Sequence, residues 1–182
     1  MDFEARQFRD VVGHFASGLT VVTGVSGGRP QGLTCQSFFS VSLDPPLIAI
    51  APSKASQSWP DIARNGMICI NVLCADQAEL ARTFSKSGID KFVEVGWSSS
   101  ANGAARIDGA LAWIECRIEN VHDAGDHYLV VARVLAIESS RGEPLLFFRG
   151  GFGRFKREER AAAGRSGVDA PGLGDFLIDL WT

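Results

Sequence analysis

Residues 31–51 read QGLTCQSFFSVSLDPPLIAIA. Two apolar, strand-like stretches lie on either side of the Asp-Pro-Pro sequence at 44–46, which is typical of a turn. Small or polar residues interrupt the first stretch between Leu33 and Phe38. Because such residues leave the main-chain amides accessible beside apolar walls, we interpret this segment as one wall of a binding site.

The rest of the chain repeats the strand-like pattern, with only short helical segments in between. Strands rich in β-branched and aromatic residues are predicted at 19–25, at Leu33, and at 38–41, 47–51, 67–73, 110–122, 127–138 and 144–150. Residues 96–109 read as a polar loop. Turn signals recur about every 8–12 residues and no βα alternation is present, which favours a mainly β fold and an antiparallel barrel.

A few short helices are also expected. Residues 2–15 carry an apolar stripe at helical spacing, formed by Phe8, Val11, Val12 and Phe15.

The other two helices are predicted from their end signals. Within 55–66, Ser58 is expected to cap a helix that Gly66 ends. Asp76 is expected to open a further helix, with Glu79 completing a capping box.

Length and charge narrow the class of protein. The 182 residues suggest one domain, expected over 1–155, and the formal net charge of −3 argues against nucleic acid as the main partner. No apolar run is long enough to span a membrane, and the first ten residues are too charged for a signal peptide, so we expect a cytoplasmic protein. The tail, 156–182, is charged and Gly/Ala-rich but ends in DFLIDLWT, which we expect to dock on the body or on a second subunit.

The four cysteines do not form a metal motif. They are Cys35, Cys69, Cys74 and Cys116. No CxxC pair is present, so buried, reduced thiols are expected, and no metal is predicted.

Two short motifs could belong to a hydrolase or a metal enzyme. GVSGG at 24–28 matches G-x-S-x-G, but the following Gly-Gly-Arg-Pro favours a hairpin turn over the helix that a nucleophile elbow needs. HDAGDH at 122–127 could hold a metal, could be a purely structural turn with Gly125 at positive φ, or could position one histidine for small-molecule binding. We favour the last interpretation.

A phosphate site is a further hypothesis. Lys54, Ser56 and Ser58 precede the helix expected within 55–66, where loop amides and hydroxyls could bind an anion. Arg82, at the end of the helix opened by Asp76, could reach the same anion or simply favour the helix dipole. GGFG at 150–153 is not a dinucleotide fingerprint, because no βα unit surrounds it.

Several segments, taken in order, resemble the short-chain flavin reductases, which are the reductase components of two-component flavin-diffusible monooxygenases. These segments are FRDVVGHFASGLTVVTG, GLTCQSFFSVSLDPPLIAI, KASQSW, ICINVL, ARTFS, DKF, GDHYLVVARV and PLLFFRGGF, within residues 6–153. The resemblance implies an antiparallel split β-barrel of the FMN-binding type, usually a homodimer. It implies FMN or FAD as the flavin, and NADH or NADPH as the co-substrate.

The resemblance also implies the site residues. The flavin ring is expected against the loop made by Thr34, Cys35, Gln36, Ser37 and Phe38, with Ser40 and Val41 nearby. The flavin phosphate is expected near Lys54, Ala55, Ser56, Gln57, Arg82 and Phe84. The nicotinamide nucleotide is expected at His127, Phe148, Arg149 and Gly150.

The implied activity is hydride transfer from NAD(P)H to the flavin, with His127 positioning the nicotinamide, and supply of reduced flavin to a separate monooxygenase. Four positions depart from the family pattern. Ser17 replaces a frequent threonine and Phe152 a common tyrosine, while the Cys35-Gln36 pair is closest to reductases that serve aromatic or steroid-ring hydroxylases. The alternatives are a flavin-binding protein without turnover, a hydrolase or metal enzyme, and a barrel that binds no flavin.

Overall fold

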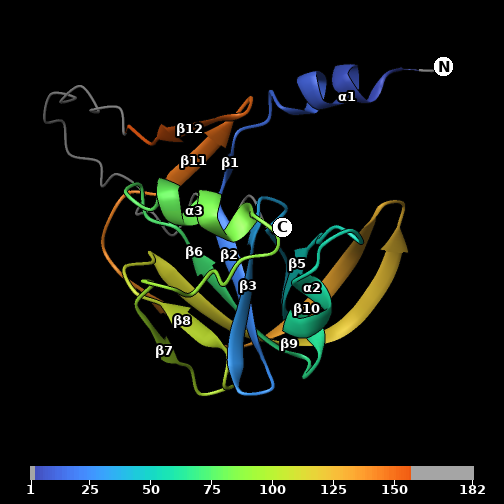
Figure 1. Cartoon of the computed structure of the whole chain (residues 1–182). Helices are drawn as coiled ribbons and strands as arrows, with labels where there is room; N and C mark the ends of the chain where they lie inside the picture. Colours follow the sequence, from blue (N-terminus) through green and yellow to red (C-terminus); the bar gives the residue numbers. More distant parts are fainter. Residues whose placement is uncertain (1–2, 157–182) are drawn as a thin grey trace, which may run out of the picture.

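The computed structural model describes residues 3–156, in which three short helices accompany twelve strands (Figure 1). In chain order the elements are α1 (Ala5–Val12), β1 (Ser17–Gly18), β2 (Thr20–Ser26), β3 (Arg29–Cys35), β4 (Phe39–Leu43), β5 (Pro46–Ile50), α2 (Trp59–Ala63), β6 (Met67–Val72), α3 (Ala78–Ser85), β7 (Trp97–Ser99), β8 (Ala105–Ile107), β9 (Ala112–Ala124), β10 (His127–Ser139), β11 (Leu145–Phe148) and β12 (Gly151–Arg154).

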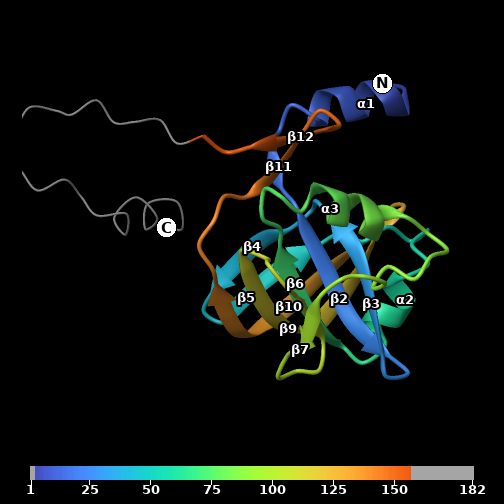
Figure 2. The ribbon, with the colours of Figure 1, turned by 60° about the vertical axis from the view of Figure 1, so that its left-hand side comes forward.

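A seven-stranded antiparallel sheet forms the body of the molecule. Its strand order is β3-β2-β6-β9-β10-β5-β4, so the opening sequence, residues 31–51, supplies both edge strands. A smaller sheet of β1, β11 and β12 lies above it, and α3 lies between the two (Figures 1 and 2). The strands of the described range do not close into one ring. The predicted mainly β, split-barrel architecture is confirmed.

Strand β2 is buried on both faces because it lies between two apolar clusters. Val22 packs in a cluster with Ile50, Ile68 and other strand residues. Its neighbour Val21 points to the opposite face, into a cluster that includes Phe84 of α3. Burial on both faces explains why LTVVTGV is a continuous apolar run rather than an alternating one.

Both predicted hairpin turns are confirmed. Gly27 and Gly28 have φ values of 58° and 76° and join β2 to β3, so no helix follows Ser26. The Ser26 hydroxyl donates to Asp61, at 3.1 Å. Gly125, at φ 65°, starts the turn between β9 and β10. The GVSGG sequence is therefore turn chemistry and not a nucleophile elbow.

The prediction of one polar loop over residues 96–109 is wrong, because this segment contains the small hairpin β7–β8. Buried polar side chains of the main sheet attach it. The amide oxygen of Asn71 accepts the Ile107 N–H at 2.8 Å, and the amide nitrogen of Asn71 donates to Val21 O at 3.0 Å. No local pattern in 96–109 encodes this attachment, because the partner groups lie more than 30 residues away.

Ser58 is the N-cap residue of α2, as predicted, but neither of the two predicted side-chain capping interactions forms. Ser58 makes no capping hydrogen bond, and Ser56 Oγ accepts the Trp59 N–H instead, at 3.2 Å. Helix α3 begins after Gln77 rather than Asp76, and Gln77 Oε1 accepts the Cys74 N–H at 2.9 Å. Ser58 Oγ instead accepts a hydrogen bond from the Lys91 ammonium, a tertiary contact that the local pattern did not predict. Gly66, at φ 67°, does follow the end of α2 as expected.

Helix α1 is shorter than the predicted 2–15, and none of its residues is buried. Val11 is 65% exposed, and the following Phe15 is 79% exposed. The helix extends away from the main sheet, beside β11 and β12 (Figures 1 and 2). The apolar stripe that predicted the helix therefore does not pack on the described body of the chain.

Other expectations are met in part. All four cysteines are free, and three of them are buried. Each helix of the described range falls short of the length and apolar character that a membrane crossing needs. The proposed tail lies outside the described residues apart from Lys156, so its docking stays a prediction.

The closest approach of α2 to β2 gives a stability prediction. A Cβ on Gly24 would lie 2.5 Å from Ile62 O and 3.0 Å from Ile62 Cα, both main-chain atoms. Gly24→Ala is expected to lower the free energy of unfolding by about 1–3 kcal/mol through overpacking, as measured by urea denaturation. Gly18→Ala, where nothing lies within 4 Å, should change it by about 0.5 kcal/mol or less; an equal loss in both variants would contradict the prediction.

Candidate active site

The main cleft has a volume of about 930 Å³ and lies where several elements of the opening stretch meet α3 and α1. Its lining residues are Phe8, Val12, Leu33, Thr34, Cys35, Gln36, Ser37, Ala51, Pro52, Ser53, Ala55, Ser56, Ser58, Phe84, Ser85, Lys86, Ser87, Lys91 and His127. Seven of the predicted flavin-binding residues and His127 are among them. None of the lining residues is acidic, and the size suits a cofactor.

Side-chain hydrogen bonds fix the loop that follows β3. Thr34 Oγ1 donates to Ala81 O of α3 at 2.6 Å. Ser37 Oγ accepts the Ala51 N–H at 2.8 Å and lies 3.3 Å from Cys35 Sγ. These polar side chains therefore attach the loop to neighbouring elements, and their hydrogen bonds are already made within the protein.

The main chain of the same loop supplies free donors. The N–H groups of Gln36 and Phe38 have no main-chain acceptor within residues 3–156. Gln36 lines the cleft together with the apolar side chains of Leu33 and Phe84, so its unpaired donor suits the polar edge of a flat heteroaromatic ring. This is the observation by which the site fits a flavin.

The Cys35 thiol is not an activated nucleophile. It is buried, and burial raises the pKa of the Cys35 thiol above its ordinary value. Burial also raises the pKa values of Cys69 and Cys116 to about 12. A thiol with a raised pKa holds its proton at neutral pH, which argues against covalent catalysis by these groups.

Residues 53–58 form the wall opposite the end of α3. Ser53, Ala55, Ser56 and Ser58 line the cleft, as the phosphate hypothesis requires. The Ser53–Ser58 loop is held by hydrogen bonds from Ala55 N–H to Ser53 Oγ, at 3.2 Å, and from Trp59 N–H to Ser56 Oγ. It also joins β10 through a bridge between Ser53 and His127.

His127 enters the same cleft from the start of β10. Its Nδ1 lies 2.7 Å from Asp126 Oδ1. With Nδ1 bonded to that carboxylate, Nε2 is the ring nitrogen left to face a ligand. The hydrogen bond from His127 lowers the pKa of Asp126, so Asp126 is ionised at neutral pH and fixes the ring.

A second cleft of about 470 Å³ lies between α1 and the β11–β12 turn. Arg149 and Gly150 line it, as expected for the nicotinamide nucleotide site, and Arg149 has a positive φ of 48°. Gln36 lines both this cleft and the main one. Phe148 lines neither, but packs edge-on against His14, with ring centroids 6.4 Å apart.

Several predicted residues are not brought into the main cleft. Lys54 forms an ion pair with Asp123, at 2.7 Å, and Arg82 forms one with Glu79. The Arg82 guanidinium also lies 4.7 Å from the ring centre of Phe152, the residue that departs from the family pattern. Four more predicted residues also lie outside the main cleft. Phe38 packs against the core, Gln57 is exposed, and Ser40 and Val41 lie on the exposed edge strand β4.

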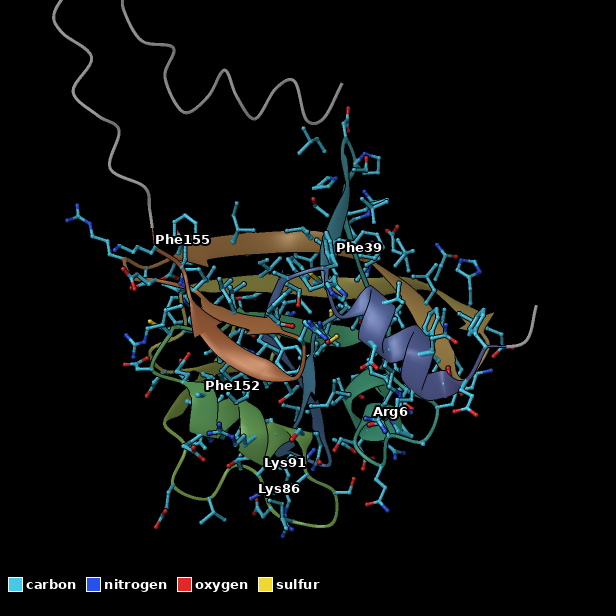
Figure 3. The ribbon with its side chains drawn as sticks, turned by 90° about the horizontal axis from the view of Figure 1, so that it is seen from above. Arg6, Phe39, Lys86, Lys91, Phe152 and Phe155 are labelled. Carbon is cyan, nitrogen blue, oxygen red and sulfur yellow. The ribbon has the colours of Figure 1, made fainter. Side chains whose placement is uncertain are left out.

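Sequence reasoning missed five polar residues of the cleft, one of which is Ser53, just before the predicted phosphate segment. Ser85, Lys86 and Ser87 lie at the end of α3, and Lys91 follows them (Figure 3). The DKF segment that contains Lys91 was part of the resemblance, but nothing in its local pattern placed it in the site. Within the described residues, no group of three or more His, Cys, Asp or Glu side chains could hold a metal ion.

Comparison with known proteins agrees with this geometry. The sequence profile of the flavin reductase like domain matches residues 12–156. The reductase subunit HsaB of a flavin-dependent monooxygenase from Rhodococcus jostii is 43% identical over 148 residues, which cover 81% of this chain and 76% of that protein.

Solved structures give the same result. Nitrilotriacetate monooxygenase component B from Mycobacterium thermoresistibile superposes with a TM-score of 0.82 at 38% identity, over 92% of this chain and 96% of that one. A Streptomyces globisporus NADH:FAD oxidoreductase, solved with NAD and FAD fragments, superposes with a TM-score of 0.81 at 36% identity, over 86% and 96% of the two chains. The predictions of a flavin reductase fold and of an NAD(P)H-dependent flavin reductase are confirmed, and the chain belongs to the flavin reductase like domain family.

Proposed function

We propose that the chain binds FMN or FAD in the main cleft, reduces it with NADH or NADPH, and releases it for use by a separate monooxygenase. The observation that carries this proposal is the N–H group of Gln36, which has no main-chain acceptor within residues 3–156 and belongs to a residue that lines the cleft beside Leu33 and Phe84. A bound flavin would accept a hydride from the nicotinamide and carry the electrons away.

The residues of this chain have positioning roles in the proposal. The Gln36 N–H group binds the polar edge of the flavin ring, and favours negative charge there once the ring is reduced. Leu33 and Phe84 exclude water from its apolar part. His127, held by Asp126, orients the nicotinamide nucleotide from the other side. No protein nucleophile takes part.

The co-substrate occupies the second cleft in this proposal. Gln36 connects that cleft to the flavin cleft, so ligands in the two clefts can meet at this residue. Arg149 offers a cation to the phosphates of the nucleotide. The Arg149-Gly150 turn therefore keeps its predicted role in this proposal, whereas Phe148, which lines neither cleft, contributes only through its packing on His14.

The experiment that tests the proposal follows NADH oxidation at 340 nm in air, with and without FMN or FAD, and repeats it with NADPH. Turnover that depends on added flavin supports the reductase and ranks the two flavins and the two nucleotides. Flavin fluorescence quenching without turnover would leave the alternative of a flavin-binding protein. Gel filtration after mixing separates a diffusible flavin from one that stays bound.

The partner in this proposal is a flavin-dependent monooxygenase of the aromatic or steroid-ring hydroxylase type. The similarity to a reductase subunit of such a two-component system supports a separate oxygenase component. The Cys35-Gln36 sequence supports the ring-hydroxylase type. Product formation by a ring hydroxylase that this chain supplies with reduced flavin would support the assignment, and none with an active reductase would contradict it. The four free thiols fit action in the cytoplasm.

A homodimer is part of the same proposal, because the apolar face of α1 is uncovered in the single chain. Val11→Asp combined with Phe15→Asp is expected to convert a dimer to a monomer, since both side chains are mostly exposed and a buried carboxylate opposes association. Light scattering during gel filtration measures the mass. Arg6→Glu, a charge change on the same helix (Figure 3), is the control; a wild-type monomer would contradict the proposal.

A further inference from the structure

Lys91 is a buried cation without a counter-ion in the described part of the chain. The residue is 8% exposed. Its ammonium donates to Gly32 O at 3.0 Å, to Phe84 O at 3.0 Å and to Ser58 Oγ at 2.9 Å. All three N–H donors therefore bind neutral oxygens, and no carboxylate within residues 3–156 forms an ion pair with it.

Such a cation is costly unless an anion approaches it. A buried charge loses its hydration, and dipoles of carbonyl and hydroxyl oxygens replace only part of that loss. Burial lowers the pKa of the Lys91 ammonium below its ordinary value. A ligand anion in the adjoining cleft would offset the missing countercharge.

The hydrogen bond from Lys91 also fixes the orientation of the Ser58 hydroxyl. An ammonium has donors only, so Ser58 Oγ must be the acceptor of this bond. Its own O–H proton must then point elsewhere, and it has no acceptor within residues 3–156. Ser58 does not cap α2, and it lines the main cleft beside Lys91. Lys91 thus holds Ser58 as a donor available to a ligand.

The surroundings of this pair favour an anion. Ser56, Ser85 and Ser87 add hydroxyl groups to the lining of the same cleft, and Lys86 adds an exposed cation. In the view from above, Lys86 and Lys91 lie together near one end of α3 (Figure 3). Since the lining has no acidic residue, nothing there repels a phosphate.

We propose that Ser58 is a phosphate ligand and that Lys91 is its positioning residue, so that the site selects phosphorylated flavins over riboflavin. Ser58 donates its hydroxyl proton to a phosphate oxygen. Lys91 does not touch the phosphate: it orients that hydroxyl and supplies the positive charge beneath it. The inference rests on the proposed flavin site and adds to it the residues that recognise the phosphate.

The test compares the dissociation constants of FMN, FAD and riboflavin, measured by flavin fluorescence quenching. Lys91→Met keeps the length of the apolar stem but removes the charge and the donors. We expect it to weaken FMN and FAD binding by about 30-fold or more, while riboflavin binding changes by about threefold or less. Ser58→Ala should weaken FMN binding about tenfold, and the double variant should not add the two losses, because both remove one interaction.

Two controls separate this role from a structural one. Lys91→Arg retains the charge and should recover part of the preference for FMN over riboflavin. Lys86→Met removes an exposed cation of the same cleft and should weaken FMN binding by less than about fivefold, because solvent screens it. A loss in Lys86→Met equal to that in Lys91→Met would overturn the assignment to Lys91 and Ser58.

The remaining outcomes are equally decisive. Equal losses for FMN and riboflavin in Lys91→Met would mean a structural role and overturn the proposal, as would unchanged FMN binding. Should Lys91→Met not fold, Ser58→Ala, a small change at a half-buried site, decides the question by the same FMN-to-riboflavin ratio. A wild-type protein that binds no flavin at all would overturn the proposed function itself.

Discussion

His127→Ala is expected to lower kcat/KM for NADH about 10- to 100-fold, because a hydrogen bond to a charged group contributes about 1.5–3 kcal/mol. The reason is the orientation of the ring: Asp126 binds Nδ1 at 2.7 Å and leaves Nε2 for the nucleotide. Steady-state kinetics with saturating flavin measure the effect. The dissociation constant of the flavin should change little, because the flavin ring is bound by the loop after β3.

The matched control for this prediction is His122→Ala. His122 is exposed on β9, in the same hairpin as His127, and does not line the cleft. The His122→Ala variant should therefore retain the wild-type kcat/KM for NADH. A collapse of flavin affinity in His127→Ala, with nicotinamide kinetics unchanged, would mean that His127 binds the flavin instead.

Ser56→Asp is expected to raise the dissociation constant of FMN about 100-fold or more. Two like charges about 4 Å apart repel by about 4 kcal/mol near a protein surface, and the flavin phosphate would lie beside residue 56. The substitution should leave the fold intact, because a carboxylate can accept the Trp59 N–H that Ser56 Oγ accepts now. Fluorescence quenching by FMN and by riboflavin measures the effect.

Riboflavin separates charge repulsion from damage to the cleft. Because it has no phosphate, its affinity should be nearly unchanged in Ser56→Asp, and added salt should restore part of the FMN affinity. Ser140→Asp places the same charge on an exposed residue outside the cleft and should leave both affinities as they are. Unchanged FMN affinity in Ser56→Asp would remove Ser56 from the phosphate site.

The aims of these experiments differ even though they concern one cleft. Substitution of His127 tests the nucleotide side, substitution of Ser56 tests the phosphate side by adding charge, and substitution of Lys91 tests it by removing charge. Only the substitution of Lys91 tests whether a buried cation orients the hydroxyl group that binds the ligand. Agreement of all three would divide the proposed site into three functional parts.

The local sequence pattern predicted an element correctly where the side chains of that element are buried as the pattern requires. LTVVTGV formed β2 because its β-branched residues are buried on both faces, and Gly27-Gly28 made the turn because both residues adopt positive φ. The same reasoning failed at the N-cap of α2. There Ser58, a good local cap, instead accepts a hydrogen bond from Lys91, which is 33 residues away.

The residues of the candidate site were likewise predicted correctly in some segments and wrongly in others. Residues of continuous segments were placed in the cleft as predicted. Thr34–Ser37 were recognised as small polar residues beside apolar strands, and Ala55 and Ser56 from the family resemblance. Lys54 and Arg82 were also plausible cations from sequence, yet carboxylates of Asp123 and Glu79 pair with them. The competition between a ligand and a neighbouring carboxylate depends on distances that sequence spacing does not contain.

The sequence by itself determined the strands of the main sheet, two of their hairpin turns, the mainly β class and the family to which the chain belongs. These properties follow from side-chain shape, turn chemistry and motif order, which act over a few residues or are repeated along the chain. Only the tertiary structure decided that Lys91, Ser58 and Gly32 meet at the edge of the cleft, where the buried Lys91 ammonium has no counter-ion among residues 3–156. Burial and hydrogen-bond partners are properties of groups brought together from distant parts of the chain, so no local pattern could have assigned them.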